Sequence, residues 1–382
     1  MPLCDVAVIG LGAMGAATTF ELASRGQRVI GIDRFEPGHA HGSSHGESRL
    51  IRMAYFEDPA YVPLVRLAYR NWRRLEALSG ETILTVTGIL EAGHAGSPMV
   101  AASLGSAVEH GIAHEVLSPA DAMRRFPAFD LPGDWDCVFQ PDAGFLEPER
   151  AIDLYLKLAA DQGAGIRTNT RVLGVEPVGE HVVVRLEGGE TIEAAAAVIA
   201  AGPWIGQLAP VLALHLRLTR QVLVWFEPNR REVTSPDRMP VFLLQTLDDV
   251  IYGVPDFAGT GVKAGSHEPC GDLEDADAGR SPANAADIER VHRVLRQRIP
   301  AAAGRPLMTQ TCVYTRSPDE HFILGPHPDW PQIVLASPCS GHGFKFASII
   351  GEALADLAMT GATDRTIGLF DPRRFQSGAP PE

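Results

Sequence analysis

The segment DVAVIGLGAMG, residues 5–15, is the part of this sequence that points most directly to a fold class. Its first five residues form a short apolar run, which suits a strand buried on both faces of a sheet. Three glycines follow at once with the spacing G-x-G-x-x-G. In a site of this type Gly10 permits a tight turn, Gly12 lets the backbone approach a pyrophosphate, and Gly15 lets helix and strand pack closely.

The residues that follow complete a βαβ unit. Residues 16–25 have helical composition, and residues 28–33 predict a second parallel strand that ends in Asp33. The N-terminus of the helix would attract phosphate charge, and Asp33 would accept hydrogen bonds from ribose hydroxyls. The ordered set of strand, turn, helix, strand and acid predicts dinucleotide binding, although it does not separate NAD from FAD.

Length and composition limit the possible classes. A chain of 382 residues predicts two domains, or one large domain with an insertion. Hydrophobic residues make up 45% and charged residues 21%, as is ordinary for a folded globular protein. The formal net charge of -14 repels nucleic acid and anionic membrane surfaces, so we expect no nucleic-acid partner.

The cysteines and the N-terminus indicate the compartment. The five cysteines are scattered, odd in number and not spaced as metal-binding pairs, which favours free thiols and a reducing compartment and gives no metal site. The N-terminus lacks an export signal, and no apolar stretch approaches the roughly 20 residues that span a bilayer. We therefore expect a cytoplasmic protein without a membrane partner.

The segment FEPGHAHGSSHGESRLIR, residues 35–52, follows the nucleotide-binding unit and is rich in Gly, His and Ser. Such a loop can lie along a cofactor, or it can be a solvated surface loop. A metal site built from His39, His41 and His45 is the weakest alternative, because no nearby Cys or carboxylate pattern completes a ligand set. Arg49 and Arg52 would share one face if the stretch were helical.

Several longer motifs carry a family resemblance. These are GSSHGESRLIR at 42–52, AYFE at 54–57, YVPL at 61–64, CVYT at 312–315, DEHF at 319–322 and SGHGFKF at 340–346. The set resembles the monomeric sarcosine oxidase and N-methyltryptophan oxidase family, FAD-dependent amine oxidases of the D-amino acid oxidase-like superfamily. The resemblance spans nearly the whole chain, and the middle matches more loosely. It implies a small amino acid and O2 as partners of a monomeric enzyme.

The resemblance implies an α/β (α+β) fold in which a Rossmann-like FAD-binding domain is interleaved with a substrate-binding domain built on a mixed or antiparallel sheet. We expect the discontinuous FAD-binding domain at 1–80, 143–215 and 311–382, and the substrate-binding domain at 81–142 and 216–310. Helices are predicted at 64–78, 151–162 and 287–297, and strands within 171–185, 194–201, 216–265, 322–324 and 333–336. Residues 81–142 predict only short strands and loops.

The resemblance also assigns the cofactor site. Cys312 occupies the position that forms a thioether to the flavin ring in this family, whereas a single cysteine is otherwise most simply a small buried residue. Ser340–Gly343 lies between a predicted strand and a helix whose dipole would face the ring. The expected cofactor-binding residues are Gly10, Gly12, Met14, Gly15, Asp33, Arg34, Ser43, Ser44, Arg49, Cys312, Gly341, Gly343, Phe344 and Lys345.

The substrate needs a fixed carboxylate and a neutral amine, because the nitrogen lone pair assists departure of hydride from the adjacent carbon. By resemblance, Arg52 and Lys345 would hold the carboxylate. Lys263 matches the family's oxygen-activating lysine, where a fixed positive charge lowers the barrier to forming superoxide. The other residues assigned to catalysis or to the pocket are His45, Arg49, Tyr252, His267, Tyr314 and Leu243.

Two departures from the family affect the pocket. Ser44 and His45 stand where two histidines are common, and Leu243 stands where methionine is common in the sarcosine enzymes. The side group of the amine is therefore left open between glycine-sized, indole, and a ring as in proline or pipecolate. The expected activity is oxidation of a secondary amino acid to an imine with O2 reduced to H2O2. The alternatives are a dehydrogenase that passes electrons to a quinone or carrier, an NAD-dependent dehydrogenase and a non-catalytic binding module.

Overall fold

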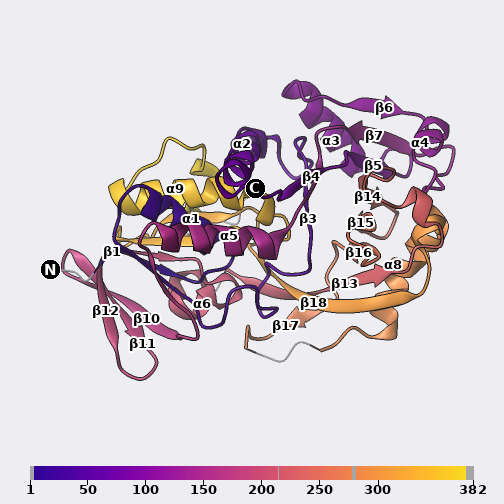
Figure 1. Ribbon diagram of the computed structural model, residues 1–382. Coiled ribbons are helices and arrows are strands. Elements are labelled where there is room, and N and C mark those ends of the chain that lie inside the picture. The colour runs from indigo at the N-terminus through magenta and orange to yellow at the C-terminus, as the bar shows by residue number, and fades with distance from the viewer. Residues whose placement is uncertain (1–3, 214, 278–280, 376–382) are drawn as a thin grey trace.

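The computed structural model describes residues 4–213, 215–277 and 281–375. Its strands form an eight-stranded sheet, a nine-stranded sheet and a small three-stranded sheet. Figure 1 shows the two large sheets in neighbouring halves of the molecule, with the long strand β18 (Pro306–Arg316) belonging to the nine-stranded sheet. This arrangement confirms the expected mixed fold, which joins a nucleotide-binding sheet to a largely antiparallel one.

The eight-stranded sheet is built around the N-terminal strand β1 (Cys4–Ile9). This strand pairs in parallel with β2 (Val29–Ile32) and β12 (Thr191–Ile199), and β12 also pairs with β20 (Ile333–Ser337). The remaining strands are β9 (Gly165–Arg167), β10 (Val172–Val178), β11 (His181–Leu186) and β19 (Ile323–Pro326). The buried strands at the centre match the apolar runs in the sequence.

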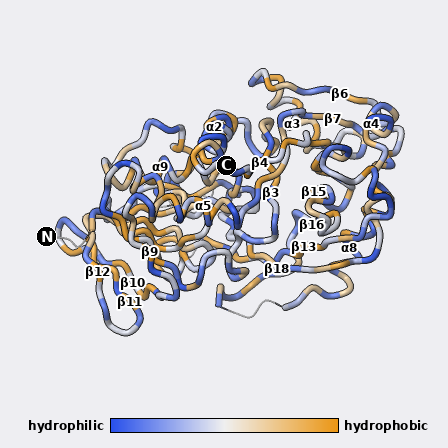
Figure 2. The backbone as a smooth tube through the Cα atoms, in the orientation of Figure 1, coloured by the Kyte–Doolittle hydropathy of each residue, from blue (hydrophilic) through white to orange (hydrophobic). Residues whose placement is uncertain are grey.

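Three helices pack together beside this sheet. They are α1 (Ala13–Ser24), α5 (Pro148–Asp161) and α9 (Ala347–Thr360), and α2 (Val62–Ser79) packs against α9. In Figure 2 hydrophobic stretches run through the interior behind α5 and α9, while hydrophilic stretches follow the outer loops. Smaller helical segments are η1 (Pro59–Tyr61), η2 (Gly202–Trp204), α6 (Ile205–Leu208), α7 (Pro210–Ala213), η5 (Phe344–Phe346), η6 (Gly368–Phe370) and η7 (Pro372–Phe375).

The glycines of the first turn have the conformations that the motif requires. Gly10 has φ 92°, in the left-handed region that favours glycine. A Cβ atom on Gly15 would lie 1.7 Å from the Gly10 carbonyl oxygen, so only glycine allows α1 to pack this closely on the turn. The βαβ unit therefore forms as the sequence predicts.

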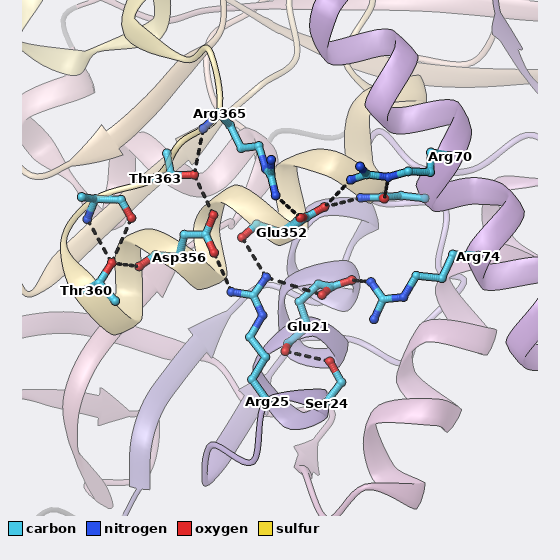
Figure 3. Close-up of polar contacts among 12 residues, drawn as sticks. Glu21, Ser24, Arg25, Arg70, Arg74, Glu352, Asp356, Thr360, Thr363 and Arg365 are labelled. Carbon is cyan, nitrogen blue, oxygen red and sulfur yellow. Dashed lines mark hydrogen bonds and ion pairs between the residues drawn. The ribbon is translucent and has the colours of Figure 1, made fainter.

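The helices are also linked by ion pairs, which Figure 3 shows in detail. Glu21 of α1 accepts from Arg74 of α2 at 2.7 Å, and Arg25 pairs with Asp356 of α9 at 2.6 Å. Glu352 of α9 lies among Arg70, Arg365 and Asn71. The network joins α1, α2 and α9.

The nine-stranded sheet forms the second half. It has the order β17-β13-β16-β15-β14-β5-β7-β6, and β18 pairs with β13 from Arg217 opposite Arg316 to Phe226 opposite Pro306. The strands are β5 (Ile89–Gly93), β6 (Glu115–Leu117), β7 (Asp136–Gln140), β13 (Arg217–Phe226), β14 (Val241–Gln245), β15 (Val250–Val254), β16 (Val262–Ser266) and β17 (Asp272–Leu273). Helix α8 (Ala285–Arg298), η3 (Arg231–Val233) and η4 (Pro300–Ala302) complete this half.

One expectation about local structure is wrong, and the helical condition considered for Arg49 and Arg52 is not met. Residues 81–142 contain α3 (Pro98–Glu109) and α4 (Pro119–Arg125) besides short strands, because Ser97 and Ser118 cap their N-termini and a proline follows each cap. Arg49 lies in β3 (Arg49–Ile51), not in a helix, and β3 joins β4 (Leu84–Val86) and β8 (Gly144–Leu146) in the three-stranded sheet. Arg49 and Arg52 are thus placed by a strand and the loop after it.

The division into domains stays a prediction. The boundary placed at residue 311 falls inside β18, which pairs along its length with β13 of the nine-stranded sheet. A strand shared in this way carries Cys312 from the second sheet toward the loops of the first. The site described next lies at this junction.

Candidate cofactor and active site

An elongated pocket runs from the glycine turn after β1 to the loop between β20 and η5, with walls from both halves of the molecule. It is lined by all but three of the residues that the sequence assigned to the site. Those lining it are Gly10, Gly12, Met14, Asp33, Arg34, Ser43, Ser44, Arg49, Arg52, Leu243, Tyr252, His267, Cys312, Tyr314, Gly341, Gly343, Phe344 and Lys345. The three buried residues that do not line the pocket are Gly15, His45 and Lys263.

The dinucleotide end of the pocket is organised by Asp33. Its Oδ2 accepts from the Leu11 backbone N–H at 2.6 Å and its Oδ1 from that of Phe35 at 2.8 Å, so the acid fixes the turn on both sides. Arg34 forms an ion pair with Asp277, and the Trp204 indole N–H donates to the same carboxylate at 2.8 Å. Asp277 was missed because its acidic segment gives no sign in the sequence that it folds back onto this end.

The residues present fit the FAD that the fold implies. Gly12 is the N-cap residue of α1 and provides no side-chain hydrogen bond, and the Ala13 N–H lies 3.4 Å from the Ser44 hydroxyl. The N-terminus of this helix borders the pocket and can attract an anionic group. At the other end Gly341 has φ 83°, and a Cβ there would lie 2.6 Å from the Tyr314 ring, so glycine keeps the pocket wall close to the ring. These features suit a long dinucleotide whose ring end reaches Gly341 and Tyr314.

Arg52 lines the pocket near Lys345 and is 3% exposed. Its Nη2 donates to Glu57 Oε1 at 2.9 Å and Oε2 at 2.7 Å, and its Nη1 donates to the Ala54 carbonyl at 3.0 Å. Its Nε lies 3.7 Å from the fully buried carboxylate of Glu91. Burial would raise the pKa of Glu57, but Arg52, His342 and Lys345 together lower it to about 2. Glu57 is therefore an anion held where two cations meet.

Lys345 is the second cation of this end. Its ammonium donates to the His342 carbonyl at 2.8 Å and to the Tyr55 hydroxyl at 3.2 Å. Burial and, to a lesser extent, the charge of Arg52 lower the pKa of Lys345 to about 7. The charge of Glu57 acts in the opposite direction and raises this pKa. The Tyr55 ring lies 4.4 Å from the Arg52 guanidinium and 5.1 Å from the ammonium, so one aromatic ring contacts both cations.

Two tyrosines and a histidine form the wall opposite. The hydroxyls of Tyr252 and Tyr314 lie 3.4 Å apart, and the His267 ring centre is 6.3 Å from that of Tyr314. Burial raises the pKa of both tyrosines and lowers that of His267. All three side chains are thus neutral near pH 7, and Leu243 adds an apolar surface to the same pocket.

Cys312 enters the pocket from β18. Its side chain is 2% exposed, and its Sγ lies 3.8 Å from the carbonyls of Ser43 and Val313. Ser43 in turn donates to the Val313 carbonyl at 2.6 Å, so the loop after β2 is joined to β18 beside the thiol. The position is suited to contact with a ring that occupies the pocket.

Two of the assigned residues that do not line the pocket, Lys263 and His45, are held by hydrogen bonds to neighbouring segments. The Lys263 ammonium in β16 donates to the carbonyls of Gly46 and Ser48 at 2.8 and 2.6 Å and to the Ser48 hydroxyl at 3.0 Å. Arg49 also donates to the Ser48 carbonyl, at 2.8 Å, and itself lines the pocket. His45 is 2% exposed and its Nδ1 lies 3.1 Å from the Gln310 amide oxygen. Lys263 itself is 3% exposed.

Sequence reasoning missed Tyr55, Glu57, Glu91 and His342. Three of these lie within the motifs at 54–57 and 340–346 that carried the resemblance, which was the available signal. Glu91 lies in the middle of β5, where an isolated acid in an apolar strand gave the only hint.

No helix of the residues that the structure describes is long and apolar enough to cross a membrane. In the same residues, no group of three or more His, Cys, Asp or Glu side chains is arranged to hold a metal ion.

Comparisons with known proteins agree with this geometry. The FAD dependent oxidoreductase (DAO) family matches residues 5–357. Monomeric sarcosine oxidase of Streptomyces avermitilis is 37% identical over 379 residues, 98% of this chain and 98% of that protein. N-methyl-L-tryptophan oxidase of Yersinia pestis is 32% identical, over 97% of this chain and 99% of that protein.

Among solved structures, a variant of NikD, an unusual amino acid oxidase essential for nikkomycin biosynthesis, has a TM-score of 0.87. Its sequence is 24% identical, and the match covers 97% of each chain, so this likeness supports the fold. Because the family model matches most of the chain, the chain belongs to the FAD dependent oxidoreductase family. It is an FAD-dependent amino acid oxidase that resembles sarcosine oxidase.

Proposed function

We propose that this protein oxidises a secondary amino acid, sarcosine or another N-methyl amino acid, to an imine, and that O2 is reduced to H2O2. The observation that supports this most directly is the carboxylate of Glu57 on Arg52, with Lys345 beside it. A carboxylate of this chain already occupies the place where a substrate carboxylate would bind. Curated relatives that act, by their names, on sarcosine and N-methyl-L-tryptophan point to the same class of substrate.

FAD, when bound, supplies the acceptor for hydride from the carbon next to the substrate nitrogen. The residues of the chain do the rest. Arg52 and Lys345 hold the substrate carboxylate by charge-assisted contacts, and their two charges also favour the neutral form of a nearby amine. Neutral Tyr252, Tyr314 and His267 line the pocket without adding a charge that would stabilise the ammonium.

We further propose that Cys312 attaches the flavin covalently through a thioether. Its burial in the pocket wall beside Tyr314 supports this, because a ring that ends at Gly341 passes the thiol. The same bond would prevent loss of the cofactor.

Lys263 is proposed to assist the reaction with oxygen. Its ammonium is 3% exposed and lies directly behind Ser48 and Arg49, two residues that line the pocket. A positive charge that is fixed before reaction stabilises superoxide as it forms. Arg49 adds a second positive charge at the same wall.

The test is a panel of N-methyl and cyclic amino acids, scored by oxygen consumption and by peroxide formed. An oxidase yields one peroxide per oxygen with its preferred substrate. Preference for proline or pipecolate would move the substrate class to cyclic imino acids. Turnover only with an added quinone or dye would instead assign a dehydrogenase and overturn the proposed role of oxygen.

A further inference from the structure

Lysine is rare in this protein, and its placement is informative. Of the 33 Lys plus Arg residues, the sequence has lysine only at Lys157, Lys263 and Lys345. Lys157 is on the surface, with a side chain 72% exposed, whereas Lys263 and Lys345 are 3% and 6% exposed. An ammonium is a compact point charge that titrates when buried, which a guanidinium does not do. Two of the three lysines are therefore buried ammonium groups.

The ammonium of Lys263 is held in a small backbone cage. Its three protons have three acceptors, the carbonyls of Gly46 and Ser48 and the Ser48 hydroxyl. Gly46 has φ 99° and Glu47 has φ 65°, so two successive residues are in the left-handed region. A residue other than glycine is strained there, and such strain persists only where the surroundings hold it. Something must therefore hold the turn of residues 46–48, which we call the lysine turn.

Glu149 holds the lysine turn from its other side. Its Oε1 accepts from the backbone N–H of Gly46 at 2.6 Å and of Glu47 at 3.2 Å. Glu149 lies in the first turn of α5, on a rigid element of the first half of the molecule. The N–H groups of the turn thus face a carboxylate while its carbonyls face Lys263 on β16 of the second half.

The remaining contacts of the lysine turn support the same arrangement. The Trp225 indole N–H donates to the Glu47 carboxylate at 2.9 Å, and the Trp225 ring lies 5.6 Å from the Lys263 ammonium. Burial, and then Arg49, lower the pKa of Lys263, while Glu149, Cys312 and Glu47 act in the upward direction. These are the titratable and charged groups that face the ammonium from β3, α5, β18 and the turn itself.

We propose that Glu149 is a positioning residue that fixes the lysine turn and thereby keeps the Lys263 ammonium charged and in place for the reaction with oxygen. This inference rests on the proposed function of Lys263. The proposed role of Glu149 differs from a purely structural one because the charge of Glu149 affects the protonation of the Lys263 ammonium.

The kinetic test compares Glu149→Gln with Glu147→Gln. Glu147 is two residues away, caps the same helix and pairs with Arg150 at 3.6 Å, so it is a matched control. In stopped flow, Glu149→Gln should move the pH midpoint of the reaction with oxygen down by about one unit, which is 1.36 kcal/mol, and should slow this reaction about tenfold at a pH well above the wild-type midpoint. Reduction by substrate under anaerobic conditions should change little. Glu147→Gln should leave both reactions as in wild type.

The second readout is an NMR titration of the Lys263 ammonium in the oxidised holoenzyme without substrate. Lysine labelled with 13C at Cε gives three resonances in this protein, and exposed Lys157 serves as the internal reference. The variants Lys157→Arg and Lys263→Met each remove one resonance, which assigns these two signals and, by difference, that of Lys345. The midpoint of the Lys263 signal should fall in Glu149→Gln and stay unchanged in Glu147→Gln. Glu149→Asp keeps the charge and should keep the wild-type midpoint, so that a fall in Glu149→Gln is assigned to the lost charge.

The outcomes separate this inference from the function on which it rests. If Lys263→Met leaves the oxygen reaction unchanged, the proposed role of Lys263 is wrong. If Lys263→Met slows it but Glu149→Gln shifts neither the rate nor the Lys263 midpoint, Glu149 is only a structural contact and the inference is overturned.

Discussion

Arg52 donates through one nitrogen, Nη2, to both carboxylate oxygens of Glu57, at 2.9 and 2.7 Å. Its other nitrogens face the Ala54 carbonyl and the carboxylate of Glu91. A substrate carboxylate that binds Arg52 must therefore displace Glu57 from Nη2. The internal ion pair neutralises a buried guanidinium.

Glu57→Gln should strengthen binding of a carboxylate inhibitor, because the internal competitor for Arg52 loses its charge. We expect about tenfold tighter binding at pH 6, equal to about 1.4 kcal/mol, measured by titration of the flavin spectrum. The pH is chosen below the pKa of about 7 of Lys345, because loss of Glu57 removes a charge that raises this pKa. The matched amide of the inhibitor should bind equally to both proteins. Weaker binding of the acid to Glu57→Gln would mean that Glu57 supports the site and does not compete for it.

Carboxylate affinity should fall as pH rises through 7. The pKa of Lys345 is lowered to about 7, so its ammonium is present below this pH and is lost above it. A bound carboxylate raises that pKa again, and binding is coupled to proton uptake. The dissociation constant for a non-titrating carboxylate should be flat at pH 5.5 to 6 and rise above 7. In Lys345→Met the rise should disappear, and its persistence would assign the titration to another group.

Cys312→Ser should release the cofactor. If the thioether forms, wild-type protein precipitated with acid stays yellow, whereas the precipitate of Cys312→Ser is colourless and its supernatant contains FAD. Cys339→Ser is the control, since Cys339 also lines the pocket but lies outside the proposed link. Flavin that washes out of acid-treated wild type would exclude the covalent bond.

Gly15→Ala and Gly105→Ala should have opposite effects on stability. Both glycines lie inside helices, α1 and α3, but a Cβ on Gly15 would lie 1.7 Å from the Gly10 carbonyl, while one on Gly105 meets nothing within 4 Å. Gly105→Ala should stabilise by about 0.5–1 kcal/mol because alanine loses less backbone entropy. Gly15→Ala should destabilise by about 3 kcal/mol or more, at the high end for a point mutation. Thermal unfolding of both variants gives the comparison.

The sequence predicted those parts of the fold whose signals are local. The βαβ unit, the long helices and the strand-rich second half follow from apolar runs and glycine spacing, and they form as expected. Helices α3 and α4 were missed because their segment is rich in Pro and Gly and was interpreted as loops. In fact the prolines lie at the first helical positions, directly after capping serines.

Site residues that lie within the sequence motifs could be predicted. Their hydrogen-bond and ion-pair partners could not be predicted, because these contacts form only in the folded chain. Arg52, Lys345 and Cys312 were found through their motifs, and they line one pocket. Glu57 on Arg52 and Glu149 at the lysine turn depend on how a side chain points after folding. Asp277 meets Arg34 across 243 residues of sequence, which no local pattern encodes.

The most direct test of the account compares an N-methyl amino acid with the simple amine that lacks its carboxylate, by anaerobic bleaching of the flavin. If Arg52 and Lys345 hold the substrate carboxylate, the acid should bleach wild type at far lower concentration than the amine. Arg52→Met should lose about 2–3 kcal/mol of that preference, as expected for one charge-assisted contact to a buried partner. Equal bleaching of wild type by the acid and the amine would contradict the account.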